Sequence, residues 1–210
     1  MTSSKKKKPT PFTILVDTRE QMPLDFSPFA ADGVSVETGT VWPGDYTIKG
    51  WEKSIAFERK SVSDLIGTLK SGYVGKDSIR RYESRFDLEL EEFERHYDRA
   101  FVIIEPDSPE KIRECGGDPV GCDALVQIIQ HWYRSAIPPA SVLAFIRALS
   151  VEYGCHIYLA VSREDAAHEI VETAKMYIKS RRHVIHRGKM QKEETAAKDA
   201  AAKVVEADPW

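Results

Sequence analysis

Alternating apolar and polar residues mark several short strands in the first third of the chain. The β-branched run at residues 12–16 has strand character, and residues 34–37 alternate as a half-buried strand does. Residues 46–48 follow a Pro-Gly turn signal, and residues 54–58 form another apolar run that ends on an acid. Because these segments lie close together in the chain, we expect a sheet whose early strands are joined as hairpins.

After these strands, apolar residues recur at the spacing that is typical of helices. Residues 61–64 have the form of a capping box directly before an apolar stretch, which predicts the start of a helix. Residues 76–97 are long and charged with apolar residues on one face, which predicts a second helix. The apolar run at residues 100–104 predicts a buried strand, whereas residues 107–119, rich in Pro and Gly, predict a loop.

The remaining pattern predicts two amphipathic helices, a strand and a last helix. The helices lie at residues 122–134 and 141–153, the strand at 156–161, and the last helix runs from Ser162 to about residue 180. A chain of 210 residues with this order suits one α/β domain with appendages. We therefore predict three parts, which are a disordered basic tail at 1–11, one domain at 12–180, and a basic, then Ala/Lys/Glu-rich helical tail at 181–210.

Composition narrows the classes of protein that fit. Hydrophobic residues make up 42% of the chain, and its formal net charge of −3 provides no global basic field for nucleic acid. No apolar stretch is long enough to cross a bilayer or to form a signal-peptide core. The three cysteines lack zinc-site spacing and cannot all pair, which indicates reduced thiols. We expect a soluble intracellular protein, in the cytoplasm or nucleoid, or in the nucleus of a eukaryote.

Acidic and basic residues gather near the ends of the predicted strands. Side chains two apart in a strand point the same way, so Glu58 and Lys60 project to one side if the strand persists through Lys60. With Asp45 from a neighbouring strand, they make a site of hard oxygen ligands. Such a site suits Mg²⁺ or Mn²⁺ better than zinc.

This arrangement predicts metal-assisted phosphodiester hydrolysis. Asp45 and Glu58 would bind the metal, which polarises a phosphodiester oxygen and lowers the pKa of a bound water. Lys60 would orient or deprotonate that water, or stabilise charge in the transition state. Arg59 faces the opposite side in an ideal strand, where it holds phosphate or buttresses a carboxylate.

Other charged residues near these strands have two interpretations each. Asp17 and Glu20 are candidate further ligands, and Arg19 is a candidate phosphate or structural contact; Asp17 equally suits a turn after a strand. Asp64 occupies the N3 position of the capping box, where a carboxylate satisfies backbone N–H groups. A separate basic cluster near the C-terminus is the best candidate for DNA contact away from the site, through Arg181, Arg182, Arg187 and Lys189.

The joint pattern resembles the nuclease domain of the XPF-type structure-specific endonucleases, which include the archaeal Hef nucleases. It consists of Val-Asp-x-Arg-Glu from residue 16, Gly-Asp-Tyr from residue 44 and Glu-Arg-Lys-Ser-x-x-Asp-Leu-Ile from residue 58, within a resemblance over residues 12–180. It implies a restriction-endonuclease-like core with a mixed central sheet flanked by helices, a divalent metal and hydrolysis that leaves a 5′-phosphate. It also implies that Asp45, Glu58 and Lys60 are catalytic, that Asp17 and Glu20 belong to the site, and that Arg59 and Asp64 support it.

The resemblance leaves substrate and assembly open. The sequence shows no tandem helix-hairpin-helix pattern after residue 180, and residues 72–77 lack P-loop spacing, so we expect no nucleotide cofactor. We predict a metal-dependent endonuclease acting on branched or otherwise structured DNA in repair or recombination, as a homodimer or a heterodimer. The alternatives are a catalytically inactive nuclease-fold subunit that binds DNA or acts as a scaffold, and a protein-interaction module.

Overall fold

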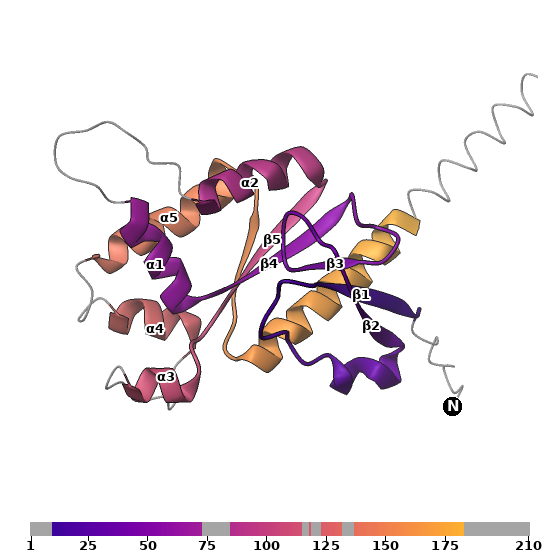
Figure 1. The fold of residues 1–210 in the computed structure, drawn as a ribbon, viewed down its shortest axis with the longest axis horizontal. Coiled ribbons are helices and arrows are strands. Elements are labelled where there is room, and N and C mark those ends of the chain that lie inside the picture. The colour runs from indigo at the N-terminus through magenta and orange to yellow at the C-terminus, as the bar shows by residue number, and fades with distance from the viewer. Residues whose placement is uncertain (1–9, 73–84, 115–117, 119–122, 132–136, 183–210) are drawn as a thin grey trace, which may run out of the picture. The chain divides into compact units, whose positions relative to one another are not determined.

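A six-stranded mixed β-sheet organises the computed structural model (Figure 1). Its strands, in chain order, are β1 (Phe12–Asp17), β2 (Val34–Gly39), β3 (Tyr46–Ile48), β4 (Ile55–Ser61), β5 (Arg99–Glu105) and β6 (His156–Leu159). Their order across the sheet is β2-β1-β3-β4-β5-β6. β3 is antiparallel to both of its neighbours, and the other pairs are parallel. The α/β class and the mixed sheet expected from the sequence are confirmed.

The chain divides into two compact units, Met1–Ile170 and Val171–Trp210. In the second unit the structure describes residues 171–182, which are helical. The domain boundaries expected from the sequence, at residues 12 and 180, stay a prediction. The described residues are 10–72, 85–114, 118, 123–131 and 137–182.

Helices occupy the connections between the strands. They are the 3-10 helix η1 (Ser27–Asp32) and the α-helices α1 (Val62–Gly72), α2 (Arg85–His96), α3 (Pro109–Glu114), α4 (Ala124–His131) and α5 (Pro139–Val151). Residues 163–170 are also helical. Parallel neighbours in a sheet require such crossovers, which a two-residue turn cannot provide. Among the described residues, no helix combines the length and the apolar character that a bilayer crossing requires.

The core of the first unit lies on both faces of β4 and β5. On one face Ala56, Val102 and Ile104 pack in a buried cluster with residues of α1, α2, α4 and α5. On the other face the ring of Phe57 stacks on that of Phe101, with centroids 5.2 Å apart. Strands that are buried on both sides are expected to read as continuous apolar runs, as the start of β4 and most of β5 do.

The structure corrects two expectations about local structure. β1 and β2 are parallel, so only β3 and β4 form the expected hairpin. Residues 107–119 were expected to form a loop, but α3 begins there at Pro109, because proline suits the first turn of a helix. The helix expected at residues 76–97 appears as α2 in its second half, and residues 73–84 lie outside the described part.

The turn that leads into β3 depends on a glycine. Gly44 has φ +109°, and a Cβ atom there would lie 3.2 Å from the ring of Phe93 on α2 and 3.3 Å from the carbonyl oxygen of Phe57. The hydroxyl of Tyr97 also donates to the carbonyl oxygen of Pro43 at 2.9 Å. α2 therefore fixes the backbone directly before Asp45.

We expect Gly44→Ala to lower the free energy of unfolding by about 3 kcal/mol, because backbone strain and a steric clash with Phe93 add together. Gly50→Ala is the matched control, since Gly50 also has a positive φ of +85° but a Cβ atom there would meet nothing within 4 Å. The control should lose only about 1 kcal/mol. Urea denaturation measures both, and equal losses would show that packing of α2 on this turn contributes nothing.

Candidate active site

Asp45, directly before β3, lies near Glu58 on β4. The antiparallel register ends at the pair Tyr46–Phe57, and the charge of Asp45 acts on Glu58. The Asp45 N–H donates to the carbonyl oxygen of Phe57 at 3.0 Å, and the Arg59 N–H donates to Asp45 Oδ2 at 2.8 Å. The two carboxylates therefore lie close enough at this end of the β3–β4 pair for their charges to interact.

Burial and mutual repulsion oppose ionisation of these two acids. Desolvation raises the pKa of Asp45 to about 6, although the N–H of Arg59 acts in the other direction. Glu58 is only 6% exposed, and desolvation followed by the charge of Asp45 raises its pKa well above the usual value. Two carboxylates in this state gain stability from a cation between them.

Lys60 lies on the same side of β4 as Glu58. Its Nζ is 4.0 Å from Glu58 Oε1, and its side chain is largely buried. β4 continues through Ser61, so the sequence-based condition for this placement holds and the predicted juxtaposition of Glu58 and Lys60 is confirmed. An ammonium group therefore stands beside the paired carboxylates.

Glu89 on α2 is a site neighbour that the sequence analysis did not select. Its negative charge acts on both Asp45 and Glu58 and helps to raise their pKa values. It lies one helical turn before Phe93, which packs against Gly44. An acid at an apolar position of the helical repeat was the signal available in the sequence.

The residues present fit a Mg²⁺ or Mn²⁺ site of low protein-ligand number. Within the described part of the chain, no three His, Cys, Asp or Glu residues are grouped so as to hold a metal ion. Mg²⁺ commonly takes one or two carboxylates and completes its shell with waters and substrate phosphates. Asp45 and Glu58 provide that pair, and their raised pKa values show the local need for positive charge.

Asp17 acts as a structural brace in this conformation. It is 2% exposed, and its Oδ1 accepts from the N–H and Nε of Arg19 at 2.8 and 2.6 Å, while Oδ2 accepts from the N–H of Val41 at 2.7 Å. Burial acts to raise the pKa of Asp17, but these hydrogen bonds hold it below the usual value. Metal ligation by Asp17 stays a prediction, and it requires one of these bonds to be exchanged.

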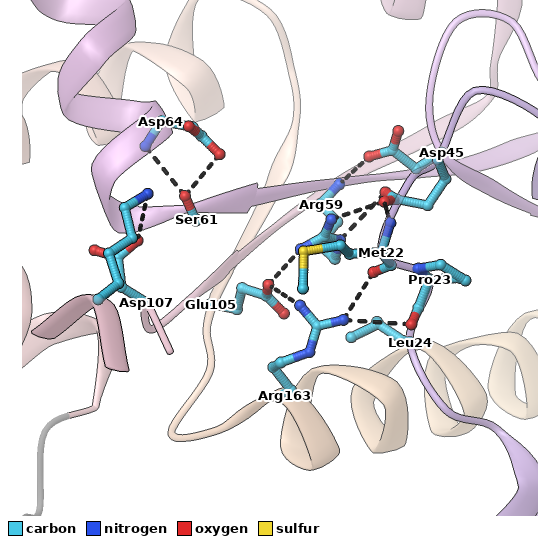
Figure 2. A network of polar contacts seen from close by, with 12 residues as sticks. Met22, Pro23, Leu24, Asp45, Arg59, Ser61, Asp64, Glu105, Asp107 and Arg163 are labelled. Atoms are coloured by element: carbon cyan, nitrogen blue, oxygen red, sulfur yellow. Dashed lines mark hydrogen bonds and ion pairs between the residues drawn. The ribbon is translucent and has the colours of Figure 1, made fainter. Parts of the chain in front are cut away.

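Arg59 supports the site from the opposite face of the sheet, as strand alternation predicts. Its Nη2 and Nε donate to the two carboxylate oxygens of Glu20 at 2.9 and 3.3 Å. Its Nη1 donates to Glu105 (Figure 2). In this structure Arg59 and Glu20 therefore neutralise each other. Their part in the reaction stays a prediction.

Glu105 joins this network to a second arginine. Its Oε1 also accepts from Nη1 of Arg163 at 2.7 Å, and Nη2 of Arg163 donates to the carbonyl oxygen of Met22 at 2.7 Å (Figure 2). Burial raises the pKa of Glu105, and its Oε2 is a buried oxygen for which the described residues supply no hydrogen-bond partner. The network ties the loop that carries Glu20 to β4, β5 and the helical residues 163–170.

Asp64 lies at the start of α1, as the capping pattern predicts. The Asp64 N–H donates to Ser61 Oγ at 3.1 Å, and Ser61 Oγ donates to Asp64 Oδ2 at 2.7 Å (Figure 2). The carboxylate thus accepts from the cap hydroxyl, not from its backbone N–H. This contact fixes the point where β4 becomes α1, and a further supporting role for Asp64 in the reaction stays a prediction.

The candidate DNA-contact residues lie in the second unit. Arg181 is described, and its Nε donates to the hydroxyl of Tyr177 at 3.1 Å while its guanidinium lies 5.1 Å from that ring's centroid. Arg182 is described and exposed, whereas Arg187 and Lys189 lie outside the described residues. Contact of this cluster with DNA stays a prediction.

Comparison with known proteins gives a family and a fold. A family model described as the ERCC4 domain matches residues 16–173. The structure of XPF from Aeropyrum pernix is similar with a TM-score of 0.54 at 23% identity, covering 83% of this chain and 69% of that chain. XPF from Aeropyrum pernix in a complex with DNA has a TM-score of 0.52 at 23% identity, with 80% and 66% covered. No curated protein matches.

We expect Glu105→Ala to reduce the free energy of unfolding by about 3 kcal/mol, because it removes the shared buried acceptor of Arg59 and Arg163. Glu37→Ala is the control, since Glu37 pairs with Lys49 at 2.6 Å where both side chains are about half exposed. An exposed pair contributes less than about 1 kcal/mol. Chemical denaturation compares the two variants, and a loss at Glu105 no larger than at Glu37 contradicts the bracing role.

We also expect Asp45→Asn to stabilise the metal-free protein at neutral pH. The pKa of Asp45 rises from 3.8 to about 6 on folding, so the stability of the wild type falls as pH rises through that window. The variant should be more stable by about 3 kcal/mol at about pH 7.5, and the difference should vanish below about pH 4.

Denaturation at several pH values with chelator present measures this difference. Asp25→Asn is the control of opposite sign, because hydrogen bonds at Ser27 lower the pKa of exposed Asp25. That variant should lose stability at neutral pH. A destabilised Asp45→Asn protein would contradict the electrostatic description of the site.

Proposed function

Because the chain belongs to the ERCC4 domain family, we propose that it is a divalent-metal-dependent endonuclease that hydrolyses phosphodiester bonds in DNA. The observation that carries this proposal is that Asp45 lies close enough to Glu58 for their charges to interact, with Lys60 Nζ 4.0 Å from Glu58. A structurally similar protein, XPF from Aeropyrum pernix, is known in complex with DNA, which supports DNA as the substrate. We further propose branched or otherwise structured DNA, in repair or recombination.

Asp45 and Glu58 would hold Mg²⁺ or Mn²⁺ through their carboxylate oxygens. When bound, the metal polarises a phosphoryl oxygen and lowers the pKa of a coordinated water. The N–H of Arg59 fixes one oxygen of Asp45, so the other oxygen is oriented without loss of side-chain freedom at the time of binding. The pair thus provides a preorganised negative site.

Lys60 supplies the positive charge of the protein at the point of reaction. Its position beside Glu58 lets the ammonium donate to the attacking water or to the phosphate oxygens on which charge develops. Arg59 cannot serve both this face and its own, because its three donor nitrogens are directed at Glu20 and Glu105. We therefore propose that Lys60 is catalytic and that Arg59 positions the strand.

We expect purified protein to cut DNA with Mg²⁺ or Mn²⁺ and to be inactive with chelator. Lys60→Ala should lower the cleavage rate by at least about 100-fold, because it removes charge stabilisation in the transition state, while most DNA affinity remains. A panel of flap, fork, gapped and duplex DNAs measures the rate, and binding is measured separately. Glu37→Gln, which changes a charge at the β2 edge, is the matched control and should cut normally.

Two outcomes would contradict this proposal. Normal cleavage by a folded Asp45→Ala/Lys60→Ala protein would reject the site. Metal-independent DNA binding by the wild type with no cleavage of any substrate would favour the alternative, a catalytically inactive nuclease-fold subunit.

A further inference from the structure

Trp42 is a large aromatic residue that the fold leaves half exposed beside the candidate active site. Its exposure is 48%, whereas its neighbour Val41 is 2% exposed. Three peptide units separate Trp42 from Asp45, so their Cα atoms are at most about 11 Å apart, which is about three base steps of stacked DNA. A short stretch of nucleic acid therefore spans the distance between the ring and the carboxylate pair.

The loop that carries Trp42 is held at several points. The N–H of Val41 donates to Asp17 Oδ2 at 2.7 Å, and Tyr97 donates to the carbonyl oxygen of Pro43 at 2.9 Å. Gly44 lies against the ring of Phe93. The indole is thus presented from a fixed backbone, which lowers the entropy that a ligand contact must overcome.

Arg19 packs its guanidinium, which is paired with Asp17, against this ring. Its guanidinium carbon lies 4.8 Å from the indole centroid, and Nε and Nη2 are held by Asp17 Oδ1 at 2.6 Å and by the carbonyl oxygen of Val41 at 2.9 Å. The Arg19 side chain is nevertheless 52% exposed. An aromatic ring for a base and a cation for its phosphate are the two groups by which proteins bind single-stranded nucleic acid.

A cavity of about 430 Å³ adjoins the ring. Trp42, Thr47 and Tyr97 contribute to its wall, and its charged residues are Glu52, Lys53 and Arg95. Its volume is in the range of sites that hold small organic groups. The cavity therefore offers space for a base that stacks on Trp42.

We propose that Trp42 and Arg19 form a stacking subsite for an unpaired nucleobase next to the scissile phosphate. This inference rests on the proposed function and names its substrate as DNA that has unpaired nucleotides beside the cut. A base within a duplex is stacked between its neighbours and reaches the ring only after it is unstacked. Selection for structured DNA would thus originate in the nuclease unit itself.

The test is the ratio of affinities for a splayed fork and for a blunt duplex of the same sequence, measured with Ca²⁺ in place of Mg²⁺. Trp42→Leu should lower the fork-to-duplex ratio by about 5- to 100-fold, because stacking on one aromatic residue contributes that much. Trp42→Phe retains a π-face and should keep most of the ratio. Trp51→Leu is the matched control, because Trp51 is a partly exposed tryptophan between β3 and β4 that does not line the cavity, and it should leave the ratio unchanged.

A second measurement uses only the wild-type protein, so that it does not depend on the folding of a variant. 2-Aminopurine at the unpaired position nearest the junction should be quenched on binding, and the same base within the duplex should not. An unchanged ratio in Trp42→Leu, an equal loss in Trp42→Phe, absent quenching, or no fork binding up to about 100 µM would each overturn the subsite. A changed ratio without cleavage would reject the proposed function and leave the subsite in place.

Discussion

Asp45 and Glu58 lie near each other where the β3–β4 pairing ends, and both are largely removed from water. Like charges close together are destabilising, and burial adds to the cost. The N–H of Arg59 nevertheless holds Asp45 Oδ2 at 2.8 Å, beside the strand that carries Glu58. The pair therefore favours a bound cation, and the ammonium group of Lys60 already supplies part of the positive charge.

The ion pairs that hold this end of β4 in place lie on its opposite face. Arg59 pairs with Glu20 and Glu105, and Arg163 extends the same network to the backbone at Met22. A buried ion pair adds little net stability, but breaking it is costly, so its main effect is to fix relative positions. This network joins segments that are far apart in the sequence and holds the strand end in one conformation. The active face needs that rigidity to place its charges.

The sequence correctly predicted features that depend on the alternation of residues along a strand. It failed for features that depend on which strands pair with each other. Strand alternation placed Glu58 and Lys60 together and Arg59 on the other side, which the structure confirms. The same alternation carries no information about which strand pairs with which, so β1 and β2 were expected to form a hairpin but are parallel. Glu89 was not selected from the sequence, because only the packing of α2 on the turn at Gly44 brings it to the carboxylates.

The low net charge of the chain gives a physical reason to expect that DNA is recognised by short-range contacts close to the site. A formal net charge of −3 provides little long-range attraction for a polyanion, and the carboxylate pair repels phosphate until a cation is present. Discrimination among DNA structures must then come from short-range contacts near the cut. A fixed indole such as Trp42 distinguishes an unstacked base from a stacked one without needing net charge. The proposed structure-specific cutting is therefore compatible with a weak overall field.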